Sequence, residues 1–139
     1  MKIEKEKPKV RKEFYRDMLT PLQYNVAFEH GTETAFDNAY HDHKEEGLYE
    51  SIASGETLFS SKDKYDSGSG WPSFTKPVVG APISYKVDST GGMTRTEVSC
   101  TSDEVHLGHV FEDGPKELGG KRYCINSACL EFVPRKNLS

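Results

Sequence analysis

The first regular pattern of apolar and polar positions is a short helical one, which follows a charged start. Thr20 suits a helix N-cap, Pro21 suits the first helical position, and Gln23 stands where a capping box has Glu or Gln. Apolar residues follow at positions 24 and 26–28, and Gly31 is a typical helix stop. A short helix is therefore predicted after Thr20, ending near Gly31.

Beyond Gly31 the helical spacing gives way to short runs rich in β-branched and aromatic residues. Clusters of Gly, Asp, Ser and Pro separate these runs, a pattern typical of strands and turns. The predicted strands are 48–53, 57–60, 83–87, 93–100, 106–111, 122–125 and 129–133, with turns at 54–55, 66–70, 90–92, 114–115 and 119–120. The predicted fold class is mainly β, with antiparallel β-sheets of short strands and a helical N-terminal segment.

The chain has 139 residues and a net charge of −4, from 18 Lys and Arg against 22 Asp and Glu. A chain of this length fits one compact domain that needs neither a disulfide nor a metal to fold. Residues 1–12 hold six basic and two acidic side chains. We therefore expect residues 1–16 to be a charged N-terminal tail and residues 17–139 to be a single domain.

Composition also excludes some partners. The negative balance gives no general attraction to nucleic acid, and no apolar run approaches the ~20 residues that a membrane span needs. The start lacks the apolar segment of a secretory signal, so the expected location is the cytoplasm. The three cysteines cannot all pair with one another, which makes thiol chemistry the first function to consider.

Cys124 lies between Arg122 and Asn126. In an extended segment these three side chains share one face, because side chains alternate with period two. The guanidinium favours a thiolate and the amide can hydrogen-bond a reacting oxygen, so Cys124 is a candidate nucleophile. The alternative is a small buried apolar residue. By the same alternation Cys129 faces the other way on this strand, and packing is its expected role.

Two further segments hold candidate chemistry. His106 and His109 stand three apart across a glycine, followed by Asp113, which suits metal binding or acid–base work. Two histidines without a nearby cysteine pair make a poor zinc site, and Asp113 is also a typical turn residue. Trp71 follows the glycine-rich loop 66–70, where an indole face can line a pocket for a thioether. A place in the core is its alternative.

Together these segments resemble one family in their order and approximate spacing. The matching blocks are DHKEEG (42–47), GWPSF (70–74), RTEV (95–98), HLGHVF (106–111) and RYCINSA (122–128). They are similar to the B-type methionine sulfoxide reductases, and the resemblance runs from about Leu19 to Pro134. It implies a mainly β fold and reduction of the R epimer of methionine sulfoxide in proteins, which repairs oxidative damage.

The resemblance implies roles for individual residues. Cys124 would attack the sulfoxide sulfur, release methionine and become a sulfenic acid. His109, together with Asn126 and with His106 as a further candidate, would position the oxygen and supply the proton that lets it leave. Arg122 would favour the thiolate.

Other implied roles concern the substrate and the reductant. Asp113 would orient the polar network, and Trp71, assisted by Phe111, would hold the S-methyl group of the substrate. The implied partners are oxidised methionine residues in proteins and a thioredoxin or small-thiol reductant, and the chain is expected to act as a monomer. Ser69 stands where the family often has a resolving cysteine, which implies a one-cysteine cycle. His41 replaces a common aromatic residue and is expected to alter the pocket rim.

No cofactor and no metal are expected. Many members of the family bind a structural zinc through two Cys-x-x-Cys pairs, and the matching positions here are Ser51, Ser54, Cys100 and Asp103. One thiolate, one carboxylate and two hydroxyls are not a tetrahedral zinc site. The resemblance is therefore to the metal-free branch of the family.

Two other functions are weighed against this one. A Cys–His acyl hydrolase could use Cys124, His109 and Asp113, but it would need an oxyanion hole that the sequence does not reveal. A β-fold binding module could grip methionine-rich segments through Trp71, but it would have no need of a reactive thiol.

Overall fold

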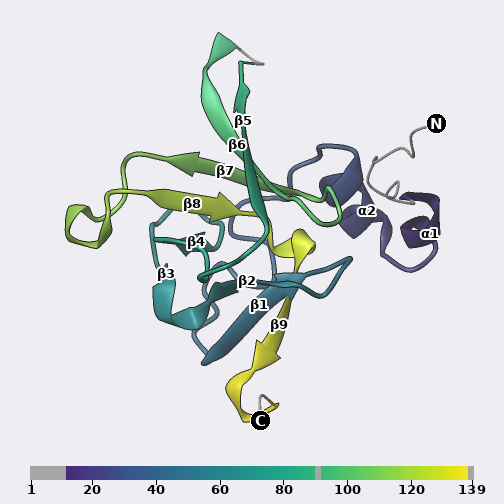
Figure 1. Cartoon of the computed structure of the whole chain (residues 1–139), viewed down its shortest axis with the longest axis horizontal. Coiled ribbons are helices and arrows are strands. Elements are labelled where there is room, and N and C mark those ends of the chain that lie inside the picture. Colours follow the sequence, from purple (N-terminus) through teal and green to yellow (C-terminus); the bar gives the residue numbers. More distant parts are fainter. Residues whose placement is uncertain (1–11, 90–91, 138–139) are drawn as a thin grey trace, which may run out of the picture.

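A computed structural model describes residues 12–89 and 92–137 (Figure 1). Two helices, α1 (Lys12–Arg16) and α2 (Pro21–Phe28), precede the strands. The capping box of α2 is confirmed, because the Thr20 hydroxyl accepts from the Gln23 backbone N–H and the Gln23 side chain accepts from the Thr20 backbone N–H. Neither helix is long and apolar enough to cross a membrane in the described ranges.

Of the charged tail predicted for residues 1–16, only the last part lies within the described residues, and it is helical. Residues 1–11 lie outside the described residues, but residues 12–16 form α1. This helix is held by packing, since the Tyr15 ring stacks on Phe28 of α2 with 5.7 Å between centroids. Arg16 adds a second contact, because its guanidinium lies 4.5 Å from the Tyr24 ring centroid and donates to the Tyr24 hydroxyl at 3.3 Å.

The strands of the described residues form two antiparallel sheets, which confirms the mainly β prediction. The three-stranded sheet has the order β2 (Thr57–Ser60), β1 (Gly47–Ser51), β9 (Leu130–Pro134). The six-stranded sheet has the order β3 (Lys64–Tyr65), β4 (Ser73–Phe74), β8 (Arg122–Ile125), β7 (His106–Phe111), β6 (Arg95–Cys100), β5 (Ile83–Asp88). Short 3₁₀ turns are η1 (Ser61–Asp63), η3 (Lys116–Leu118), η4 (Ser127–Cys129) and η5 (Arg135–Asn137).

The two sheets share an aromatic core. Phe74 of β4 stacks on Phe59 of β2 with 4.5 Å between ring centroids, and it meets Tyr49 of β1 edge-on at 5.3 Å. All three side chains are fully buried, and each such burial stabilises the fold by roughly 1.5–3 kcal/mol. This packing holds β4 and its neighbour β8 against the smaller sheet, while the β5–β6 hairpin projects from the body (Figure 1).

The predicted strand 129–133 is wrong at its start. Cys129 belongs to η4, so it does not lie on one strand with Cys124. The chain turns there because the Glu33 carboxylate accepts hydrogen bonds from the backbone N–H groups of Ser127 and Ala128, which leaves them no part in a strand ladder. Cys129 is nevertheless fully buried, in agreement with the packing role expected for it. Of the turn expected at 90–92, residues 90 and 91 lie outside the described residues.

Candidate active site

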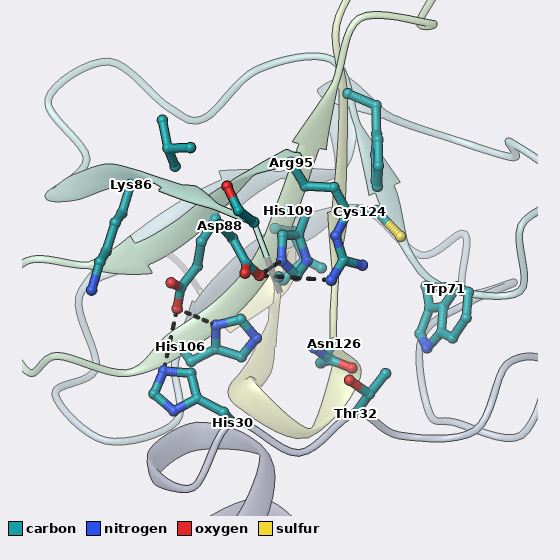
Figure 2. A pocket seen from close by; sticks show the side chains of 16 residues that line it. His30, Thr32, Trp71, Lys86, Asp88, Arg95, His106, His109, Cys124 and Asn126 are labelled. Atoms are coloured by element: carbon teal, nitrogen blue, oxygen red, sulfur yellow. Dashed lines mark hydrogen bonds and ion pairs between the residues drawn. The ribbon is translucent and has the colours of Figure 1, made fainter. Parts of the chain in front are cut away.

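A cavity of about 520 Å³ lies where β5 to β8 meet the segment after α2 (Figure 2). The structure brings six of the predicted site residues to its wall: Trp71, His106, His109, Phe111, Cys124 and Asn126. Arg122, Asp113 and Ser69 line a separate, more open cavity together with Tyr65. The predicted residues therefore divide into a group that lines the same cavity as Cys124 and a group that lines the second cavity.

Cys124 and His109 are direct partners across the β7–β8 ladder. Side chains of directly opposed residues lie on the same face of a sheet, so the thiol and the imidazole enter the cavity together. Gly108 makes this close pairing possible, because a Cβ at that position would lie 2.0 Å from the backbone oxygen of Cys124. The glycine between the two histidines is thus required by the approach of β8.

His106 reaches the same cavity through a β-bulge. The partners of Val98 and Ser99 on β7 are Gly108 and His106, so β7 carries one extra residue at this point. The bulge shifts the alternation of side chains, and two histidines three apart face the same side instead of opposite sides. Their rings lie 5.7 Å apart, centroid to centroid.

Arg122 lies on the same face of β8 as Cys124, two residues away. Its Nε and one terminal nitrogen donate to the two oxygens of Asp113 at 2.9 and 3.1 Å, and its guanidinium carbon lies 4.4 Å from the Phe111 ring centroid. The bidentate bond lowers the pKa of the Asp113 carboxyl. Asp113 is exposed and acts on Arg122, not on a polar network inside the cavity.

Cys124 is half-buried, and this burial raises the pKa of its thiol. The Arg122 charge and a hydrogen bond with the Ser69 side chain act in the opposite direction, but burial prevails. Arg122 therefore lowers the pKa of Cys124, but it does not offset the effect of burial. The contact with Ser69 places its side chain within hydrogen-bond reach of the Cys124 sulfur.

Glu33 was not found from the sequence, but its backbone positions two residues of the cavity wall, Trp71 and Asn126. Its backbone oxygen accepts from the Trp71 indole N–H at 3.1 Å, and its backbone N–H donates to the Asn126 side-chain oxygen at 3.2 Å. Asn126 is further fixed by donation from its amide to the Leu107 backbone oxygen. A buried carboxylate in a segment without regular structure leaves no periodic signal, so only the fold reveals it.

Asp88, at the end of β5, holds His109 from the opposite side to Cys124. Its carboxylate lies 3.0 Å from His109 Nε2 and 3.6 Å from the Arg95 guanidinium. A carboxylate on one imidazole nitrogen fixes the ring orientation and the tautomer. The block RTEV contains Arg95 as a signal for this group, but nothing in the sequence connects Asp88 with His109.

Comparison with protein-family models gives a match to the SelR domain over residues 19–134, which is most of the chain. The chain belongs to the SelR domain family. This is a family of methionine-R-sulfoxide reductases, so the resemblance found in the sequence is confirmed at the level of the family and of its general activity. The matched range includes each residue described above around the SelR cavity.

The structure brings together Ser51, Ser54, Cys100 and Asp103, the four positions to which the resemblance assigns a zinc site, but their side chains do not fit the metal. Asp103 Oδ2 accepts from the Ser51 hydroxyl and from the Ser54 backbone N–H, while Oδ1 accepts from the Val105 backbone N–H. Burial and the neighbouring Asp103 raise the pKa of Cys100 to about 12. A buried carboxylate bound to hydroxyl and amide donors, beside a protonated thiol, is not a tetrahedral thiolate set.

Proposed function

We propose that this SelR domain reduces the R epimer of methionine sulfoxide in proteins, with Cys124 as its nucleophile. The observation that carries the proposal is the position of the Cys124 thiol, directly opposite His109 and in one cavity with Trp71. An apolar indole face suits the S-methyl group, and the polar side of the cavity suits the sulfoxide oxygen.

In the proposed reaction, the Cys124 sulfur donates two electrons to the sulfoxide sulfur, and the oxygen ends on Cys124 as a sulfenic acid. The substrate leaves as methionine. His109, held by Asp88, supplies the proton that the oxygen needs as its bond to the substrate breaks, and Asn126 shapes the site around it. Because burial disfavours the thiolate in the free enzyme, Cys124 transfers its proton as substrate binds, and His109 accepts this proton and delivers it to the sulfoxide oxygen.

The cycle closes when two external thiols reduce the sulfenic acid and form a disulfide and water. Cys100 and Cys129 are fully buried, and burial raises the pKa of both thiols. They are therefore poor resolving thiols, and a small thiol is the expected reductant. No resident metal or cofactor enters the proposed cycle.

The proposed function is tested with a methionine sulfoxide peptide of a single configuration and dithiothreitol. The R peptide should yield methionine and the S peptide none, because one cavity that seats the methyl group on Trp71 and the oxygen near His109 accepts one configuration. Chromatography of the products measures both. Equal consumption of the two epimers, or acylation of Cys124 by an activated ester without sulfoxide reduction, contradicts the proposal.

Ser69→Cys should create a resolving cysteine. Ser69 lies within hydrogen-bond reach of Cys124, so a thiol there can attack the sulfenic acid and form a disulfide with release of water. The expected results are a mass lower than that of the reduced protein by two hydrogen atoms after one equivalent of substrate, and faster turnover with thioredoxin. The control is Ser67→Cys, whose hydroxyl bonds to Ser69 and Ser73. A Cys124 disulfide in the control but not in Ser69→Cys contradicts the placement.

Alkylation of Cys124 by iodoacetamide should accelerate as the pH rises above the usual thiol range. Burial raises the pKa of Cys124, so the thiolate grows with pH, while Arg122 and Ser69 lower the pKa and Glu33 raises it. Arg122→Met should therefore slow alkylation at pH 7, and Arg135→Met, on an exposed arginine remote from the thiol, should not. Mass spectrometry of the alkylated peptide measures the rate. An unchanged rate in Arg122→Met contradicts the electrostatic role.

A further inference from the structure

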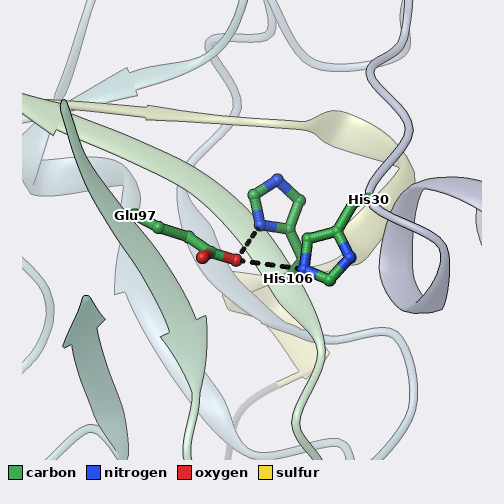
Figure 3. Close-up of side chains that lie close together, drawn as sticks. All are labelled: His30, Glu97 and His106. Carbon is green, nitrogen blue, oxygen red and sulfur yellow. Dashed lines mark hydrogen bonds and ion pairs between the residues drawn. The ribbon is translucent and has the colours of Figure 1, made fainter. Parts of the chain in front are cut away.

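Two imidazoles and a carboxylate converge at the wall of the SelR cavity. Glu97 Oε2 lies 2.7 Å from His106 Nδ1 and 3.5 Å from His30 Nε2 (Figure 3). One ligand atom from each of the three residues lies within 4.8 Å of the others. The residues come from separate parts of the chain, namely β6, β7 and the segment after α2.

We propose that His30, Glu97 and His106 bind a divalent transition metal, zinc by preference, and that the bound metal reversibly slows the reductase. Two histidines and one carboxylate are a known type of zinc ligand set that leaves a fourth position open. Tetrahedral ligands at about 2.0–2.1 Å from zinc lie about 3.3 Å from one another. The contact between His30 and Glu97 has nearly this spacing, and the contact between His106 and Glu97 needs to widen by about half an ångström.

The surroundings of Glu97 favour a cation. Glu97 and His106 are buried. Lys86 is the direct partner of Glu97 across the β5–β6 ladder and lines the same cavity, but within the described residues no Lys or Arg lies at ion-pair distance from this carboxylate. A buried carboxylate is stabilised when it is paired or coordinates a metal. Two imidazoles that share one carboxylate oxygen supply the remaining ligands in the same place.

The position of His30 favours a metal site over the alternative, in which Glu97 only orients the His106 ring by a hydrogen bond. The bond from Glu97 to His106 would be sufficient to orient that ring, and it does not need His30. His30 nevertheless turns its ring toward both, 5.2 Å from the His106 ring, from a left-handed backbone conformation with φ 60°. Its side chain is 70% exposed, so it can move to complete the ligand set when a metal arrives.

The cluster lies where a bound cation would interfere with substrate. All three residues line the cavity that contains Cys124. Figure 2 shows His30 and His106 at one end, Trp71 at the other, and His109 and Asn126 between them. A metal whose open position faces this space adds a hydrated cation to the volume that the substrate enters. The inhibition rests on the proposed reductase function, whereas the metal binding does not.

Binding is tested on the full chain after treatment with a chelator. Zinc is titrated by calorimetry and Co²⁺ by visible absorption, and one metal per chain is expected with no sulfur-to-cobalt charge-transfer band. Glu97→Gln and His30→Asn should each weaken binding by at least about tenfold, since even outer-shell changes cost about 10–100-fold. Asn also accepts a left-handed backbone, so His30→Asn keeps the proposal testable if Glu97→Gln fails to fold. His41→Asn is the matched control, because His41 pairs with a single carboxylate at 3.9 Å and should bind as wild type.

Three results would overturn the metal site: no stoichiometric binding, equal affinity in His30→Asn and wild type, or a charge-transfer band that disappears in Cys124→Ser. Inhibition is measured as methionine formed in a single turnover without added thiol, because dithiothreitol itself binds zinc. Zinc should slow the wild type and have at least about tenfold less effect on His30→Asn. Equal slowing of both overturns the inhibition. Metal binding by a protein without reductase activity would overturn the proposed function and leave the metal site intact.

Discussion

Cys124→Ser is expected to abolish reduction of the R sulfoxide in a single turnover. A hydroxyl is nearly isosteric with the thiol, but it cannot accept the sulfoxide oxygen at neutral pH, so no sulfenic acid forms. The methionine formed by this variant should not exceed the background of the assay. Methionine is counted after one equivalent of substrate is mixed with the enzyme in the absence of any other thiol.

Cys129→Ser is the matched control for this variant. The Cys129 thiol is fully buried and donates to the backbone oxygen of His106 at 2.9 Å, a bond that a hydroxyl can keep. The variant should retain nearly all the methionine yield and should still form a sulfenic acid that dimedone traps on Cys124. A comparable loss in both variants would show that Cys124 has no special role.

His109→Gln should slow the reductive step by about 10²- to 10⁴-fold, the usual contribution of a positioned proton donor. Gln is close in length and can still hydrogen-bond Asp88, but its amide has no proton to transfer at the pH of the assay. Rapid quenching of single turnovers measures the rate of methionine release. The yield at long times should still approach one equivalent, since the nucleophile is intact.

His43→Gln is the control for the loss of an imidazole. His43 hydrogen-bonds the Tyr49 hydroxyl at 3.0 Å, a contact that Gln can keep, and it does not line the Cys124 cavity. Its rate should stay within about twofold of wild type, since the change lies outside the cavity and keeps the bond to Tyr49. A His109→Gln rate equal to that of His43→Gln would remove His109 from the mechanism.

The sequence predicts the elements that local chemistry determines. Residue types at 20, 21 and 23 define the start of α2, and the strands 57–60, 106–111 and 122–125 have the predicted bounds. The strands β3 and β4 were not predicted, because two residues are too few for an alternating pattern. They exist because partners distant in the sequence supply their hydrogen bonds.

The candidate site likewise has residues that the local sequence could place and residues that only the fold brings together. Arg122 and Cys124 could be placed on one face by alternation alone, because β8 is regular. The same reasoning separates His106 from His109, and only the extra residue of β7 opposite Val98 and Ser99 brings them together. Asp88 and Glu33 approach the site through tertiary packing, so no spacing in the sequence could have found them.

The hydrogen bonds around Asp103 bear on how the domain survives in a cell under oxidation. A methionine sulfoxide reductase finds its substrate where peroxide is present, and peroxide attacks thiolates first. A cluster of four zinc-bound thiolates is exposed to that attack, whereas a carboxylate and two hydroxyls offer peroxide nothing to oxidise. Cys100, with its pKa raised to about 12, stays a thiol and reacts slowly. The oxidant that creates the substrate therefore meets no ready thiolate at these four positions, and the hydrogen bonds that join β1 to the turn after β6 are spared.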